Sequence, residues 1–163
     1  MRLLQWQSMV KENRDLPTIR DDMTYVPEHC EFKFVSNLEV RSSLQRSYDR
    51  SRACFDHACY PWVVFFAGRS IEIILFDLLD ANWVNALSSP KAPKNKSDIS
   101  SWDLSDMIAV ATDLGLAPPS VASLSPLARY WRSGLVPAFS FEVWKEEARV
   151  ALDVFARTHA FHS

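Results

Sequence analysis

The chain has 163 residues, enough for one domain with a sizeable core. Apolar residues make up 48% of it and charged residues 23%, a balance typical of globular proteins that excludes a disordered chain. The net charge of −2 excludes bulk binding to nucleic acid or to a membrane surface, so any RNA contact has to come from a local basic cleft.

The first 35 residues carry the weakest pattern. Apolar residues between Leu3 and Val10 are compatible with a short amphipathic helix that ends before Pro17, and residues 30–35 alternate as in a short extended piece. We therefore expect residues 1–35 to form an N-terminal arm that packs on the outside of a bundle.

A first helix is predicted from Ser36, because Ser36 and Glu39 have the spacing of a capping box. Residues 62–79 are apolar nearly all round, which predicts the central, most buried helix. Eighteen residues are too many for a buried strand, and the charges within the run exclude a membrane span. Arg69 and Glu72 lie one helical turn apart and are predicted to form a buried ion pair, for which a structural role is favoured over a functional one.

Residues 86–101 are polar, contain prolines and three lysines, and predict a mobile surface loop with solvated lysines. Further helices are expected over residues 102–114, from Ser125 to Arg132, and from Ser140 onward. The fold class is therefore all-α: an antiparallel helical bundle of four to five helices with a short N-terminal arm. Residues 36–163 are expected to form its single domain.

The residue types that can ligate metals or form disulfides, histidine and cysteine, are scattered along the sequence. Three cysteines (Cys30, Cys54, Cys59) lack Cys-x-x-Cys spacing and predict buried thiols in a reducing compartment. His159 and His162 are three residues apart, but a frayed C-terminal tail is favoured over a metal site. His57 is expected to pack at a helix end or to cap it. We expect no metal or other cofactor, no membrane contact, and a cytoplasmic location, since the N-terminus lacks the apolar run of a signal peptide.

Three blocks of the sequence together resemble a known family. Phe66-Ala67-Gly68-Arg69-Ser70-Ile71-Glu72-Ile73-Ile74-Leu75 is similar to an "AGRxLExxL" helix, residues 106–116 to a "LIxxAxxLGL" run, and residues 146–152 to a closing "EEAxxAL" helix. These are the helices of HEPN-like domains (the higher eukaryotes and prokaryotes nucleotide-binding family), in the same order, over residues 36–158. The resemblance implies a helical domain.

Between the second and third blocks this family commonly carries R-x-x-R-N-x-x-H-P. In the present sequence Arg129, Arg132 and Pro137 match this motif, whereas Ser133 replaces its asparagine and Val136 its histidine. Active members of the family are metal-independent endoribonucleases that use the arginine and the histidine. Proton transfer needs the histidine and the developing phosphate charge needs the arginine, so Val136 removes one of the two functions.

The resemblance also implies a homodimer with the Arg129 and Arg132 junctions facing each other, and a setting in prokaryotic defence or toxin–antitoxin systems. We expect a catalytically degenerate interaction or regulatory module that is not an enzyme and that binds a protein partner. Arg129 and Arg132 are its candidate phosphate- or partner-binding residues, although they would equally suit the carbonyl end of a helix. Arg69, Glu72 and Ser133 are candidate supporting residues.

Two alternatives remain open. One is an active metal-independent endoribonuclease whose histidine comes from elsewhere in the fold or from a partner subunit. Arg52 with His57 and Arg157 with His162 have an Arg-x4-His spacing, although such spacings arise by chance in a chain of this composition. The other alternative is an unrelated helical phage or regulatory protein that shares only the pattern of a bundle.

Overall fold

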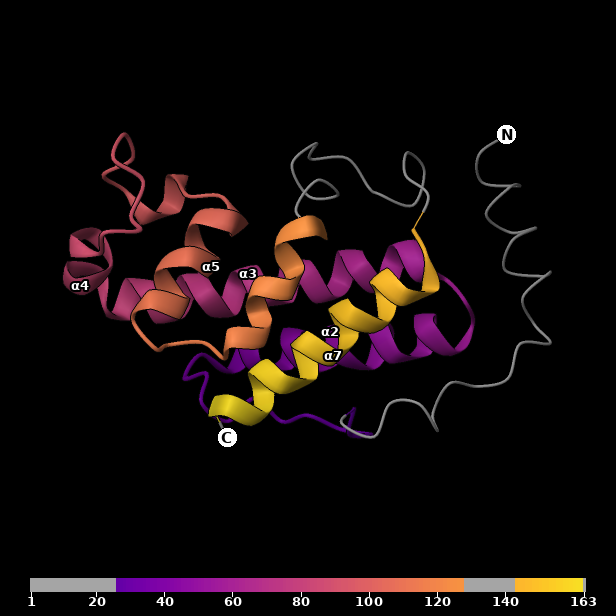
Figure 1. The fold of residues 1–163 in the computed structure, drawn as a ribbon. Helices are drawn as coiled ribbons and strands as arrows, with labels where there is room; N and C mark the ends of the chain where they lie inside the picture. Colours follow the sequence, from indigo (N-terminus) through magenta and orange to yellow (C-terminus); the bar gives the residue numbers. More distant parts are fainter. Residues whose placement is uncertain (1–25, 128–142, 163) are drawn as a thin grey trace.

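The computed structural model describes residues 26–127 and 143–162. All regular structure in these two ranges is helical, which confirms the all-α prediction. The elements are α2 (Leu38–Asp56), α3 (Tyr60–Ala81), α4 (Trp83–Ser88), the 3₁₀ helix η2 (Ile99–Ser101), α5 (Leu104–Asp113), the 3₁₀ helix η3 (Pro119–Leu127) and α7 (Lys145–His162) (Figure 1).

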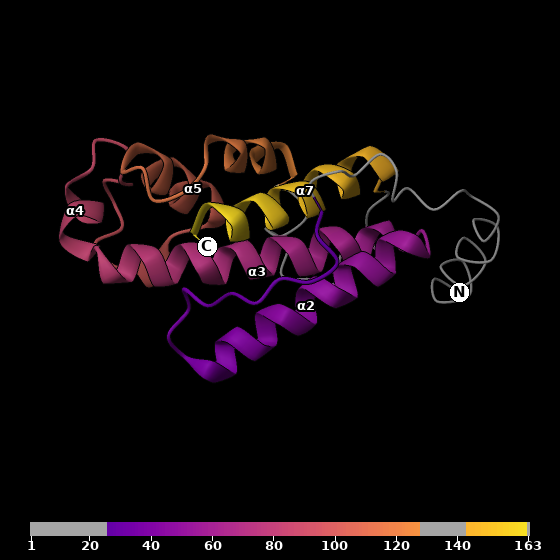
Figure 2. The same cartoon turned by 90° about the horizontal axis from the view of Figure 1, so that it is seen from below.

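Helix α3 lies at the centre and packs against α2, α5 and α7. It is the longest helix described, with 22 residues, and ten of them are buried. Figures 1 and 2 show that α2 and α3 run antiparallel, as expected for helices joined by a three-residue connection, whereas α7 runs in the same general direction as α3. The first turns of α3 and α7 lie close together, near Tyr60 and Glu146.

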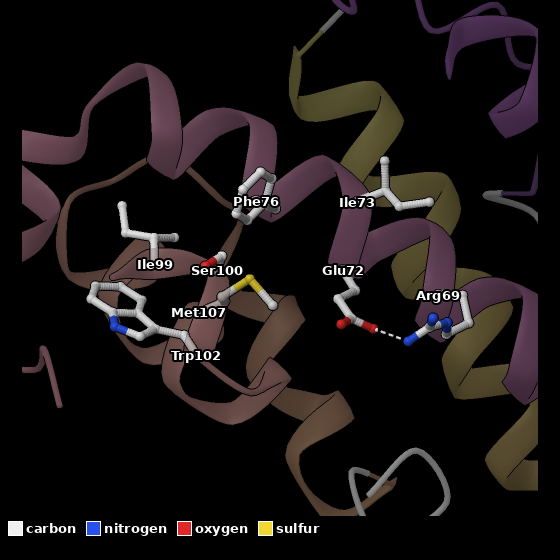
Figure 3. A pocket seen from close by; sticks show the side chains of 8 residues that line it. All are labelled: Arg69, Glu72, Ile73, Phe76, Ile99, Ser100, Trp102 and Met107. Carbon is white, nitrogen blue, oxygen red and sulfur yellow. Dashed lines mark hydrogen bonds and ion pairs between the residues drawn. The ribbon is translucent and has the colours of Figure 1, made fainter. Parts of the chain in front are cut away.

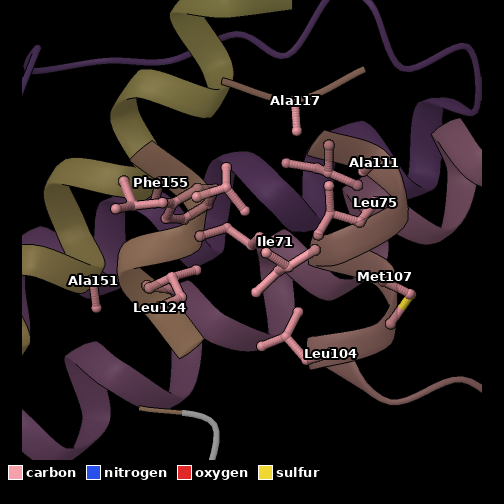
Figure 4. Packing of buried hydrophobic residues seen from close by; sticks show 14 of the residues in the cluster. Ile71, Leu75, Leu104, Met107, Ala111, Ala117, Leu124, Ala151 and Phe155 are labelled. Atoms are coloured by element: carbon pink, nitrogen blue, oxygen red, sulfur yellow. The ribbon is translucent and has the colours of Figure 1, made fainter. Parts of the chain in front are cut away.

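The core fills the space between these helices (Figure 4). Ile71 and Leu75 of α3 face Leu104 and Met107 of α5, and Phe155 of α7 closes the cluster; all five are 5% exposed or less. Close packing of this kind fixes the relative positions of α3, α5 and α7, because each side chain occupies a space that the others leave.

The cap of α2 differs from the sequence prediction by one residue. Helix α2 begins at Leu38 and its N-cap is Asn37, not Ser36. The Asn37 Oδ1 atom accepts hydrogen bonds from the backbone N–H groups of Glu39, at 2.9 Å, and Val40, at 3.1 Å. Both residue types satisfy orphan N–H groups well, so the sequence pattern alone did not separate the two neighbouring positions.

Residues 86–101 are more ordered than the loop expected from their polarity. Helix α4 extends to Ser88 and η2 occupies residues 99–101. Lys96 is not simply solvated: its Nζ atom lies 2.8 Å from Oδ2 of Asp106, and its carbonyl oxygen accepts a hydrogen bond from Nε1 of Trp102 at 3.1 Å. The pairing of Lys96 with the first turn of α5 ties this connection to the helix that follows it.

Two later helix starts also differ from the prediction. The 3₁₀ helix η3 begins at Pro119 and already contains Ser125 and Pro126, which were expected to open a helix. Helix α7 begins at Lys145 rather than after Ser140, which lies outside the described residues. Helix α7 then continues to His162, so the prediction of a frayed C-terminal tail is wrong.

Residues 26–35 contribute to the core itself and do not only cover its outside. Phe32, Cys30 and Val35 are 0%, 1% and 2% exposed, and no strand forms in this segment. Helix α2 holds the segment through its backbone: Tyr48 donates its hydroxyl to the Pro27 carbonyl at 2.6 Å, and Arg41 donates Nε to the Val35 carbonyl at 2.9 Å. Residues 1–25 lie outside the described residues.

Exchanging the two candidate caps of α2 for alanine tests the observed start of the helix. Asn37→Ala is expected to lower the free energy of unfolding by about 1 kcal/mol, because two helix N–H groups lose their acceptor. Ser36→Ala, the matched control, is expected to change it by less than about 0.5 kcal/mol, as is usual for exposed positions. Urea denaturation followed by circular dichroism measures both; the opposite ranking would restore Ser36 as the cap.

Candidate functional site

The junction that carries the family motif lies outside the described residues. Arg129, Arg132, Ser133 and Val136 all fall in the range 128–142. Their candidate roles in binding phosphate or a partner therefore stay predictions. The two supporting residues further upstream, Arg69 and Glu72, lie on α3 and are described in full.

Arg69 and Glu72 form the predicted ion pair, but on the surface and not in the interior. The Arg69 Nη1 atom lies 2.9 Å from Oε2 of Glu72, and the two side chains are 58% and 32% exposed. The prediction of a buried pair was wrong because both residues lie on the side of α3 that faces away from α2 and α7. An exposed pair contributes at most about 1 kcal/mol to stability, so the fold does not depend on it.

A groove of about 220 Å³ lies beside this ion pair (Figure 3). Helix α3 forms one wall, and the segment from η2 to α5 forms the other. The residues that line the groove are Arg69, Glu72, Ile73, Phe76, Ile99, Ser100, Trp102 and Met107.

Local hydrogen bonds fix the second wall of the groove. Asp98 caps η2 by accepting the Ser100 N–H at 3.0 Å, and Asp103 and Asp106 form the capping box of α5. Trp102 lies between these two caps, and its indole N–H is held by the Lys96 carbonyl. The wall is therefore set by backbone geometry and does not depend on a bound molecule.

The chemistry of the groove is that of a binding surface for apolar side chains with one charged edge. Ile73 and Phe76 remain 44% and 39% exposed, although both are large and apolar. Apolar surface of this kind favours a partner that covers it. The Arg69–Glu72 pair at the edge adds one positive and one negative group that can both bind a second molecule.

The groove is part of a longer apolar stripe on α3. Along this helix, the residues that point away from the core recur every three or four positions. We call the members of this set between Trp62 and Phe76 the α3 stripe; they are Trp62, Phe65, Phe66, Arg69, Glu72, Ile73 and Phe76. Two exposed carboxylates, Asp77 and Asp80, follow the stripe on the same helix. Three of its aromatic rings form a half-buried cluster: Trp62 stacks on Phe66 at 5.7 Å between centroids and meets Phe65 edge-on at 5.6 Å.

Sequence reasoning missed this stripe because residues 62–79 were interpreted as apolar all round and hence buried all round. The signal that could have revealed it is the spacing of seven between Trp62, Arg69 and Phe76, and again between Phe66 and Ile73. Positions seven apart lie on one side of a helix. A charged residue within such a series marks a side that is not fully covered.

The C-terminal histidines are packed against the segment 26–35. His159 meets Phe32 edge-on at 4.9 Å between ring centroids, and His162 lies at the same distance from Phe34. Within residues 26–127 and 143–162, no group of three or more potential ligands could hold a metal ion. These two imidazoles thus have a packing role in the described structure.

Burial lowers the pKa of both histidines, because it disfavours the charged imidazolium. The nearby Glu31 carboxylate partly opposes this effect on the pKa of His159, and the Leu116 carbonyl partly opposes it on the pKa of His162. In the folded protein, the imidazoles of His159 and His162 therefore favour their neutral form.

The two Arg-x4-His spacings correspond to structural interactions of their arginines. Arg52 donates to the Glu28 carbonyl at 2.6 Å, and Arg157 lies 2.7 Å from the Asp153 carboxylate. His57 is the C-cap of α2, with Nδ1 at 2.7 Å from the Ala53 carbonyl, which confirms the expected capping role.

The three cysteines are free thiols, as predicted. Burial raises the pKa of Cys30 and of Cys54 to about 11, and it raises the pKa of Cys59 as well. Thiols with a raised pKa carry little thiolate at neutral pH and are poor nucleophiles. Cys30 and Cys59 accordingly act as small apolar side chains.

Comparison with known proteins adds no relative: no family model matches the chain, and neither a curated protein nor a solved structure is similar to it. None of the helices in the described part of the chain is long and apolar enough to cross a membrane.

The packing of the two C-terminal histidines makes stability depend on pH. Because their pKa values lie below the ordinary value of 6.5 in the folded state, the unfolded chain binds more protons as the pH falls below about 6.5. The contribution of the two neutral histidines to stability is therefore fully present above pH 6.5 and is expected to decrease as the pH falls below 6.5. Denaturant midpoints measured on both sides of pH 6.5 test the expectation.

Variants assign this pH effect to the histidines. His159→Gln combined with His162→Gln is expected to flatten the decrease, whereas His29→Gln, at a largely exposed histidine, is expected to leave it unchanged. An equal slope in all three proteins would contradict the assignment.

Proposed function

We propose that the chain is a HEPN-like helical domain that has lost ribonuclease chemistry and acts as an interaction module. The observation that carries the proposal is the groove beside Arg69 and Glu72, together with the exposed apolar side chains of Ile73 and Phe76. A soluble helical domain that leaves such residues uncovered on its longest helix has the surface of a binding protein.

The placement of the three family-like blocks supports the same proposal. Residues 66–75 lie on α3, residues 106–116 on α5 and the turn after it, and residues 146–152 on α7. Both α5 and α7 pack against α3. The three blocks thus lie on helices that pack together, which is compatible with the resemblance. The proposal also includes the prokaryotic defence or toxin–antitoxin setting that the resemblance implies.

The loss of chemistry follows from the sequence at the junction. Val136 stands where the family carries its histidine, and valine has no proton to transfer. General acid–base catalysis typically contributes about a hundred- to ten-thousandfold in rate, so its loss leaves at most a trace of activity. Arg129 and Arg132 can still bind an anionic group of a protein or RNA in such a module.

Incubation with mixed single-stranded RNA in the presence of EDTA tests the proposal. The wild-type chain is expected to leave the RNA intact, and Val136→His is expected to confer cleavage by restoring proton transfer. Val136→Leu is the matched control, since it changes the same position without adding a titratable group.

Cleavage by the wild-type chain that disappears in Arg132→Ala would contradict the proposal. That result would favour the active endoribonuclease with a histidine from elsewhere. RNA left intact by wild type and by Val136→His alike would favour a helical protein outside this family.

A further inference from the structure

We propose that the α3 stripe is a two-fold interface for a second copy of this chain, with the two α3 helices antiparallel and the axis passing between Arg69 and Glu72. The inference rests on the proposed function, because it names the partner of the interaction module. It places the contact on α3 and not at the junction of Arg129 and Arg132.

The first argument is the geometry of the stripe. Successive residues of a helix are rotated by about 100°, so positions seven apart differ by only about 20°, and Trp62, Arg69 and Phe76 lie within about 40° of one another. Phe66 and Ile73 form a second line beside the first. Two parallel lines with this spacing are the seam on which a second helix packs at a shallow crossing angle.

The second argument is the order of the residues along the stripe. From Trp62 to Phe76 it reads apolar (Trp62, Phe65, Phe66), positive (Arg69), negative (Glu72) and apolar (Ile73, Phe76), and the exposed Asp77 and Asp80 lie beyond its second apolar end. An isologous interface requires that residue i meets residue j and that j meets i. Rotation about an axis between Arg69 and Glu72 brings each aromatic end onto the apolar end of the other copy.

The same rotation makes the charges complementary. Arg69 of one copy faces the partner's Glu72, and Glu72 faces the partner's Arg69. The intramolecular pair is exposed, so these charges can extend to a second molecule without losing a buried partner. The opposite-charge contacts on both sides of the axis set the register of the two helices.

The groove supplies the third argument. In this register Phe65 of one copy faces Phe76 of the other, beside the opening that Ile99, Trp102 and Met107 line (Figure 3). The volume of about 220 Å³ is sufficient for one aromatic ring, given that an apolar cavity of about 150 Å³ holds benzene. Each copy can thus insert one ring into the groove of the other.

Charge reversal on the stripe tests the proposal with the full-length protein. In Arg69→Glu both axis contacts become negative–negative, and in Glu72→Arg both become positive–positive. Each single variant is expected to raise the dimer dissociation constant by about a hundredfold or more, since like charges meet at the centre of the interface. Sedimentation equilibrium at micromolar concentrations measures the constant.

Mixing the two single variants gives the sharpest result. A 1:1 mixture pairs two glutamates on one helix with two arginines on the other, so a heterodimer is expected to form although neither variant dimerises alone. The double variant Arg69→Glu/Glu72→Arg restores opposite charges and is expected to dimerise like wild type.

A matched control comes from α7, where Arg149 and Glu146 form an exposed ion pair of the same i, i+3 spacing. Arg149→Glu and Glu146→Arg are expected to leave the dissociation constant unchanged. Circular dichroism spectra and melting curves of all variants confirm that the helices are intact.

Two outcomes would overturn the inference. One is a wild-type chain that stays monomeric, in which case another protein, an RNA or a segment of the same chain is the occupant of the stripe. The other is a wild-type dimer that the α3 variants do not weaken and whose two single variants fail to pair when mixed. Neither outcome bears on RNA cleavage, so a failure here is distinguishable from a failure of the proposed function.

Discussion

Helix α3 packs against α2, α5 and α7, and the apolar side chains that it buries among them hold these elements in place. Ile71 and Leu75 are fully buried, and they contact a core to which α5, η3 and α7 all contribute. Removal of either side chain would leave a cavity that the surrounding helices could close only in part. Large-to-small changes at such positions therefore typically lower the free energy of unfolding by about 2–5 kcal/mol. The positions of the groove walls follow from this packing, because one wall is α3 itself.

The same helix that organises the core also supplies the exposed stripe, and the two roles are related. A helix covered by neighbours on three sides has one side left, and the residues on that side are free of core packing. In most surface helices this side is charged and polar. On α3 it carries Ile73, Phe76 and three half-buried aromatic residues, with one ion pair among them. A binding site on such a rigid element is positioned accurately.

The sequence was sufficient to predict the class of fold and the central helix, because long apolar periodicity is the strongest local signal. It was not sufficient for features that depend on distant contacts. Lys96 pairs with Asp106 across the η2 turn, and Phe32 fills the core beside Phe155, although both lie in stretches without periodicity. The groove combines residues of α3 with residues some thirty positions later, and no local pattern encodes that approach. The choice between Ser36 and Asn37 as a cap failed for a different reason: the two residues have nearly equal capping strength, and backbone geometry decides between them.

The junction at residues 129–137 and the stripe on α3 make different demands on the sequence. Catalysis at the junction, as the resemblance to HEPN-like domains implies it, would need a histidine at the position of Val136, and valine cannot transfer a proton. The proposed association through α3 draws instead on several apolar contacts and on two charges whose order is symmetric about their midpoint. A chain can therefore lose the first function in one step while retaining the second. The exposed Arg69–Glu72 pair is worth little to the stability of the fold, which makes an intermolecular role a better physical reason for its position at the centre of an apolar stripe.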